Sequence, residues 1–206
     1  MKEIVILADG DFPKHKIPIS ILKNAEYVIC CDGAAANLLA HSSVPDAIAG
    51  DLDSIPEKIR QQYSSIIHSS PDQETNDLTK AVILAMEKHP QKITILGATG
   101  KREDHTLGNI SLLSQYKEQY GISIEMFTDY GRFIPINRTS EFDVPVGSQV
   151  SIFSLDTNIR IKSHGLDYPL DNVRFDSWWK ATLNRVNNTP FTLEFESGRV
   201  IVYTAY

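Results

Sequence analysis

The sequence predicts an α/β N-terminal domain with a mostly parallel, Rossmann-like sheet, followed by an all-β C-terminal sandwich domain. In the first 130 residues, short runs that are apolar throughout alternate with helical patterns. This alternation is typical of parallel strands that are covered by helices on both faces. From Tyr130 and Gly131 onward only strand patterns and turns remain. We therefore expect two domains, residues 1–130 and 131–206.

The first domain is expected to contain five strands and four helices. The strands are predicted at residues 4–8, 27–31, 47–49, 66–69 and 93–96. The helices are predicted at residues 33–41, 56–63, 77–88 and 103–120. In such sheets ligands bind outside the carboxyl ends of the strands, so these ends are where we look for chemistry.

The second domain is expected to consist of strands joined by turns. The strands are predicted at residues 132–136, 149–155, 158–162, 189–194 and 200–203. Turn residues occupy 145–147, 187–188 and 197–198. Because no glycine- and serine-rich linker separates the two parts, we expect them to pack closely.

Composition narrows the possible partners. The chain has 206 residues, 42% hydrophobic composition and a net charge of −6, and its basic residues are dispersed. Without a basic stripe we expect no nucleic-acid partner. The apolar run at residues 4–8 is too short for a signal-peptide core or a membrane span. Cys30 and Cys31 are adjacent, which disfavours an ordinary disulfide and suits a reducing compartment, so a cytoplasmic protein is expected.

Aspartates follow the predicted strands. Asp9, Asp32, Asp51 and Asp53 come after the first three strands, and Asp77 opens the helix after the fourth. Carboxylates at one edge repel each other unless a cation neutralises them, and Mg²⁺ held against phosphates is our first candidate. The alternative is a set of acidic turns, which we favour for Asp9 and its neighbours because a turn there needs no ligand.

Two further clusters suggest phosphate binding. In residues 71–80, Asp77 can serve a metal and Lys80 a phosphate, whereas the alternative is helix capping by Thr75 or Asn76 with Lys80 solvated. Residues 97–105 form a strand–glycine loop–helix pattern in which Lys101 or Arg102 supplies positive charge. The spacing is not that of a Walker A loop, and a histidine beside Asp104 is more often structural than a base.

Aromatic residues of the second domain offer flat surfaces. Trp178, Trp179 and the loop at residues 164–170 can stack on a planar ring, although tryptophans in a β-sandwich are more often core or interface residues.

These motifs, in this order, resemble the thiamin pyrophosphokinase family, which transfers the terminal diphosphate of ATP to the hydroxyethyl group of thiamin. The resemblance spans most of the chain. Its marks are Asp32-Gly33-Ala34, Gly50-Asp51-Leu52-Asp53-Ser54, Asp72-Gln73 with Asp77 and Lys80, Gly97 through His105 with Asn109, and Gly165-Leu166-Asp167-Tyr168-Pro169-Leu170.

The resemblance implies an ATP- and Mg²⁺-binding catalytic domain at residues 1–130 and a thiamin-binding, dimerising sandwich at 131–206. Thiamin would lie between the subunits of a homodimer. The implied Mg²⁺ ligands are Asp32, Asp51, Asp53 and Asp77. The implied catalytic residues are Asp51, Asp53, Asp77, Lys80 and Arg102. The implied binding residues for ATP or thiamin are Asp32, Gln73, Gly97, Thr99, Gly100, Arg102, Asp104, His105, Asn109, Thr182 and Asn184.

One segment departs from the family pattern. Where the family commonly has Ser-Asn-Glu or Ser-Asn-Thr, this chain has Leu183-Asn184-Arg185, so only Asn184 carries over. A contact made there by a serine hydroxyl is lost or is replaced by Thr182. Residues 151–155 are similarly altered.

The expected activity is therefore diphosphate transfer from ATP to thiamin, with thiamin diphosphate and AMP as products. Two alternatives stay open. A pyrophosphokinase acting on a pterin alcohol would use the same carboxylates and differ in its acceptor pocket. A binding module for nucleotide or thiamin would keep the glycine loop but would need no carboxylate cluster.

Overall fold

A computed structural model describes residues 2–70, 72 and 74–206 of the chain. The chain forms two compact units. The first contains the residues up to Ile110 together with Ile122–Asp129, and the second contains Ser111–Gly121 and Tyr130–Tyr206. No helix in the described ranges is both long enough and apolar enough to cross a membrane.

The sheet of the first unit is parallel throughout. Its strands lie in the order β6-β5-β1-β2-β3-β4, and each neighbouring pair is parallel. Their bounds are β1 (Glu3–Leu7), β2 (Val28–Cys31), β3 (Ala47–Gly50), β4 (Ile67–Ser69), β5 (Lys92–Leu96) and β6 (Ser123–Phe127). The first five match the predicted strands to within one residue at each end.

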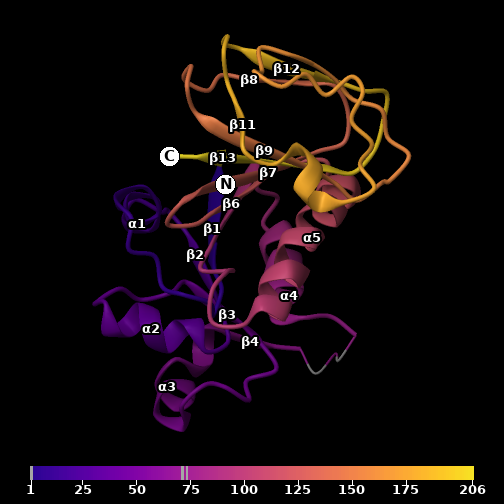
Figure 1. Cartoon of the computed structure of the whole chain (residues 1–206). Helices are drawn as coiled ribbons and strands as arrows, with labels where there is room; N and C mark the ends of the chain where they lie inside the picture. Colours follow the sequence, from indigo (N-terminus) through magenta and orange to yellow (C-terminus); the bar gives the residue numbers. More distant parts are fainter. Residues whose placement is uncertain (1, 71, 73) are drawn as a thin grey trace. The chain divides into compact units, whose positions relative to one another are not determined.

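Helices cover both faces of this sheet (Figure 1). Side chains of Val5, Leu7, Cys30 and Ile48 share a core with residues of α1, α2 and α3, whereas α4 packs on β1, β2 and β3. The helices are α1 (Lys16–Lys23), α2 (Ala34–Ala40), α3 (Glu57–Gln62), α4 (Asp77–Met86) and α5 (Glu103–Tyr120), with a short 3₁₀ turn η1 (Ser64–Ile66). The second half of α5 belongs to the second unit.

The strand order reverses beside β1. The chain runs outward from β1 to β4 on one side and then continues with β5 on the other side of β1. At such a switch point the loops after the two neighbouring strands diverge and leave a crevice at the carboxyl ends. The fold therefore directs the candidate site to the loops after β1 and β5.

Helix α1 and strand β6 are absent from the sequence prediction. Ile17, Ile19 and Ile21 alternate as in a strand, and Pro18 argues against a helix. The helix forms because Pro18 occupies its first turn, where a missing N–H is tolerated, and the His15 side chain accepts a bond from the Ile17 N–H.

The second unit contains two antiparallel sheets that share one core. The first has the order β11-β9-β13-β7 and the second β10-β12-β8. Side chains of Val150, Val202, Phe191 and Phe142, from both sheets, meet in the core. The bounds are β7 (Gly131–Ile136), β8 (Ser140–Phe142), β9 (Gln149–Ser154), β10 (Lys162–His164), β11 (Asn184–Arg185), β12 (Phe191–Glu194) and β13 (Val200–Ala205), with a 3₁₀ turn η2 (Trp178–Ala181). An α/β unit with a parallel sheet and a β unit with antiparallel sheets are thus confirmed.

The strand predicted at residues 158–162 is wrong. Only Lys162 of this range is in a strand, because β10 spans Lys162–His164. Ile159 and Ile161 are both buried, which produces the alternation of a strand, but this segment reaches the core as a loop without ladder partners.

Phe191 tests the core of the second unit. Its side chain is fully buried and stacks on Phe142 with ring centroids 4.7 Å apart. We expect Phe191→Ala to lower the free energy of unfolding by about 3–5 kcal/mol because it leaves a cavity. Urea unfolding measures this loss. Val146→Ala, at an exposed turn, should stay within about 0.5 kcal/mol of the parent, and equal effects of the two changes would contradict the assignment of Phe191 to the core.

Candidate functional site

A polar cavity of about 390 Å³ lies at the carboxyl ends of the strands of the first unit. It collects most of the residues predicted for the site. Those lining it are Asp32, Asp51, Asp77, Lys80, Gly100, Arg102, His105 and Asn109, joined by Asp9, Gly10, Ser54, Asn76 and Lys101 among others. The loops after β1 and β5 both contribute, as the reversal of strand order requires.

Asp32 is the buried member of this group. It follows β2 directly and is only 3% exposed. Its Oδ2 accepts a hydrogen bond from the Ser54 N–H at 3.1 Å, while its Oδ1 is buried and has no hydrogen-bond partner among the described residues. Burial raises the pKa of Asp32 to about 6, and the neighbouring carboxylates of Asp77, Asp53 and Asp51 raise it further against the lowering effect of the Ser54 N–H.

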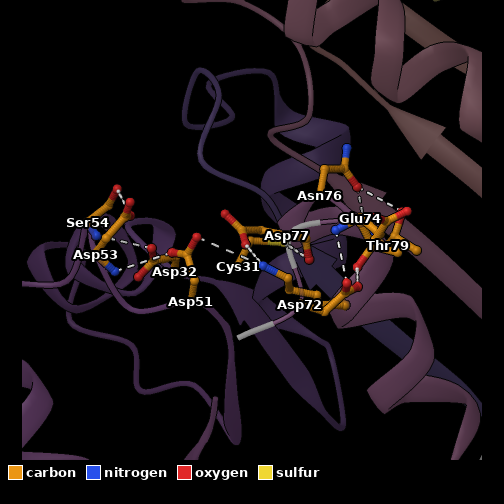
Figure 2. A network of polar contacts seen from close by, with 12 residues as sticks. Cys31, Asp32, Asp51, Asp53, Ser54, Asp72, Glu74, Asn76, Asp77 and Thr79 are labelled. Carbon is orange, nitrogen blue, oxygen red and sulfur yellow. Dashed lines mark hydrogen bonds and ion pairs between the residues drawn. The ribbon is translucent and has the colours of Figure 1, made fainter. Parts of the chain in front are cut away.

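Asp51 and Asp53 converge with Asp32 (Figure 2). One carboxylate oxygen from each of the three residues lies within 4.8 Å of the others. The sequence argument assumed an extended chain, but β3 ends at Gly50 and the segment that follows is a turn in which Leu52 has φ +72°. The two aspartates meet because of this turn and not because of strand alternation.

The start of α4 supplies a buried cation. Lys80 is 7% exposed, and its Nζ lies 3.2 Å from Asp77 Oδ1 and 4.0 Å from Asp51 Oδ2. Asn76 caps the helix, since its Oδ1 accepts from the Thr79 N–H at 2.9 Å. The capping interpretation is therefore right for Asn76 and wrong for Lys80, which is not solvated. Asp77 lies outside the group of three close carboxylates and is instead paired with Lys80.

The glycine loop, residues 97–102, runs from β5 into α5. Arg102 donates to both carboxylate oxygens of Asp104, which raises the pKa of Arg102 and holds that of Asp104 at about 2. Asp104 also accepts from the His105 N–H at 2.9 Å, so it stabilises the start of α5. Gly97, Thr99 and Asp104 do not line the cavity, whereas Arg102 and His105 do.

Asn109 connects two sides of the cavity. Its amide nitrogen donates to the Ala98 carbonyl at 2.9 Å, and its oxygen accepts from the Asn76 side chain at 3.1 Å. This pair of bonds joins α5 to the glycine loop and to the start of α4.

Three predicted binding residues are not part of this cavity. Gln73 lies outside the described residues. Thr182 and Asn184 belong to the second unit, where Thr182 donates to the Trp179 carbonyl at 2.7 Å. The Asn184 side chain accepts from the Tyr168 N–H at 3.1 Å and donates to the Tyr168 carbonyl at 2.7 Å. Asn184 thereby fixes the backbone of Tyr168, whose side chain is exposed.

Asp9 is a cavity residue that the sequence analysis left out of the candidate site. The turn interpretation needed no ligand and so removed it. Its carboxylate accepts from Asn37 at 3.1 Å and from Lys101 at 2.9 Å. Its position at the carboxyl end of the first strand was the signal that could have identified it.

The fold and the site together define a class of protein: an α/β protein with a carboxylate-rich, cation-bearing cavity at the switch point of a parallel sheet. Two family models match the chain. The model described as "Thiamin pyrophosphokinase, catalytic domain" matches residues 19–126, and "Thiamin pyrophosphokinase, substrate-binding domain" matches residues 131–203. The chain belongs to the thiamin pyrophosphokinase family.

Similar proteins agree with this assignment. Thiamine pyrophosphokinase of Bacillus subtilis (strain 168) is 32% identical over 183 residues, covering 84% of this chain and 83% of the relative. The crystal structure of thiamine pyrophosphokinase from Bacillus subtilis has a TM-score of 0.82 at 24% identity and covers 99% of both chains. Thiamin pyrophosphokinase from Candida albicans has a TM-score of 0.83 at 19% identity, covering 99% of this chain and 88% of that chain. These two structures show the shared fold.

The pH dependence of stability tests the burial of Asp32. Its folded-state pKa of about 6 lies above its ordinary value of 3.8, so the folded chain binds this proton more tightly than the unfolded chain does. Stability from this group is present below pH 4 and is lost as the pH rises through 6. With EDTA present, we expect Asp32→Asn to gain on the order of 2–3 kcal/mol relative to the parent between pH 4 and 7.5.

Urea unfolding at several pH values measures this difference. Asp171→Asn, which removes an exposed carboxylate, serves as the matched control and should leave the pH profile of the parent unchanged. Parallel pH profiles for Asp32→Asn and the parent would contradict the raised pKa.

Proposed function

We propose that this chain transfers the terminal diphosphate of ATP to the hydroxyl group of thiamin, giving thiamin diphosphate and AMP. The observation that carries the proposal is the cavity in which three close carboxylates lie beside Lys80 and the glycine loop. Membership of the thiamin pyrophosphokinase family supports the choice of acceptor.

The residues present fit Mg²⁺. Asp32, Asp51 and Asp53 offer only oxygen ligands, which this ion prefers, and their oxygens are close enough to share one cation. Asp32 Oδ1 is buried without a hydrogen-bond partner among the described residues, as expected of an atom that awaits a ligand. When bound, Mg²⁺ would supply charge neutralisation for the phosphates. We therefore assign these three aspartates as its ligands, with Asp77 and Lys80 beside them.

The chain's own residues position the reactants. The acceptor oxygen attacks the β-phosphorus, a new P–O bond forms, and the bond to the bridging oxygen breaks as AMP leaves with that oxygen. Lys80 and Arg102 place positive charge where negative charge develops on the phosphates. The hydroxyl proton passes to a carboxylate of the aspartate group. His105 and Asn109 line the cavity and hold the loop that faces the nucleotide.

The finer parts of the proposal concern assembly and surroundings. We include a homodimer with thiamin between the subunits, a cytoplasmic location, and the description of the two units as Rossmann-like and sandwich-like. Cys30 and Cys31 are buried free thiols, which agrees with a reducing compartment, and burial raises the pKa of Cys30 to about 12. Asn184 contributes to acceptor binding through Tyr168, because its own amide is bonded to the Tyr168 backbone.

The activity is tested by AMP release from ATP and Mg²⁺, with and without thiamin, together with mass detection of thiamin diphosphate. We expect AMP and thiamin diphosphate in equal amounts, and only when thiamin is present. A pterin alcohol offered in parallel should give no product. Product from the pterin alcohol alone would replace thiamin as the acceptor, and nucleotide binding without AMP release would indicate a binding module.

Asp51 and Asp53 are the most direct variants for this proposal. We expect Asp51→Asn and Asp53→Asn each to lower kcat by at least about 100-fold, because each removes a charge from the proposed metal group. Circular dichroism should show an unchanged fold, since both side chains lie at a turn. Asp171→Asn is the control with the same chemical change at an exposed position. Near-parent turnover in the Asp51 and Asp53 variants would exclude their proposed role.

A further inference from the structure

The loops after β1 and β5 are bonded to each other beyond the ends of the strands. The Ala8 N–H donates to the Leu96 carbonyl at 2.8 Å, and the Gly10 N–H donates to the Gly97 carbonyl at 2.6 Å. A Cβ at Gly10 would lie 2.3 Å from the Thr99 carbonyl oxygen, so only glycine allows this approach. The main chain of the glycine loop is therefore held in place, and its side chains are the parts that can move.

Lys101 has an unusual backbone in this loop. Its φ is +57°, a left-handed conformation that side chains other than those of glycine and asparagine seldom adopt. Such conformations persist where the surrounding structure imposes them, and they concentrate at functional sites. Here Lys101 lines the cavity, and its Nζ lies 2.9 Å from Asp9 Oδ1 in the β1 loop.

Asp9 is the fixed partner of this ion pair. Its Oδ1 also accepts from the Asn37 side chain at 3.1 Å, and its Oδ2 lies 2.7 Å from the position of a Cβ at Gly33. Two neighbours from the start of α2 thus hold the carboxylate. Lys101 has a long flexible stem, and its side chain is 48% exposed.

The pair differs from the other ion pairs of the cavity. Lys80 is buried between Asp77 and Asp51, and Arg102 is held by both oxygens of Asp104. Lys101 has a single printed carboxylate contact in a half-exposed setting, where an ion pair contributes little to stability. Of these three cations, Lys101 is the one that can leave its carboxylate at the smallest cost.

We propose that Lys101 exchanges partners: it rests on Asp9 in the empty cavity and moves to a phosphate oxygen when a nucleotide triphosphate binds. The inference rests on the proposed function, because it requires a nucleotide in this cavity. Asp9 remains bonded to Asn37 after the exchange. Lys101 then contacts phosphate directly, and Asp9 acts as a competitor that weakens nucleotide binding by holding the ammonium group in the empty state.

A double-mutant cycle tests this exchange. The ligand is the ATP analogue with a methylene group between the α- and β-phosphorus atoms, in the presence of Mg²⁺, and calorimetry of the full chain gives Kd. We expect Lys101→Met to weaken binding about tenfold, since it removes one charged hydrogen bond. Asp9→Asn should tighten binding about threefold, because it releases Lys101. The double variant should bind like Lys101→Met alone.

Matched controls separate the exchange from general electrostatics. Lys58→Met, an exposed lysine of α3, changes the net charge equally and should leave Kd unchanged. Lys101→Gln provides a second uncharged side chain, and thermal unfolding checks that each variant folds. The exchange is overturned if Lys101→Met leaves Kd unchanged, if Asp9→Asn weakens binding, or if Asp9→Asn tightens it equally without Lys101.

The same proteins keep the two proposals distinct. If the parent binds the analogue but transfers no diphosphate to thiamin, the proposed function fails while the Kd cycle still reports on Lys101. If transfer occurs and the cycle shows no coupling between Asp9 and Lys101, only the exchange fails.

Discussion

The repulsion among carboxylates at the carboxyl ends of the parallel strands is the constraint on which the rest of the site depends. Asp32, Asp51 and Asp53 bring oxygens within 4.8 Å of each other, and Asp32 is buried. Like charges at this distance are unfavourable unless a proton or a cation intervenes. Without a cation, the proton does so, which is why burial raises the pKa of Asp32 to about 6. In our proposal Mg²⁺ takes the place of that proton.

The surrounding structure distributes the positive charge that accompanies this group. Lys80 is paired with Asp77 and Asp51, Lys101 with Asp9, and Arg102 with Asp104. Each of these cations is therefore oriented before any ligand arrives. A polyanion entering the cavity competes with carboxylates for these cations, and in the proposed reaction this competition is strongest for Lys101, which is the least constrained of the three.

The sequence predicted what depends on local pattern and missed what depends on tertiary contacts. Apolar runs located β1 to β5, and aspartates at their ends located the cavity, because parallel strands end at one edge. The strand-like alternation of Ile17, Ile19 and Ile21 concealed α1, whose helix is set by Pro18 in its first turn and by the His15 cap. Asp9 was set aside because its bonds to Asn37 and Lys101 join residues distant in sequence. The burial of Lys80 likewise follows from packing that no spacing rule reveals.

The most direct test of this account is an NMR titration of the Asp32 carboxyl carbon, first with EDTA and then with saturating Mg²⁺. The account predicts a pKa of about 6 without the metal and a marked downward shift when Mg²⁺ is present, because the cation favours the charged carboxylate. An Asp32 pKa that is unaffected by Mg²⁺, measured on protein that is otherwise folded, would contradict the proposed metal group and the role assigned to the cavity.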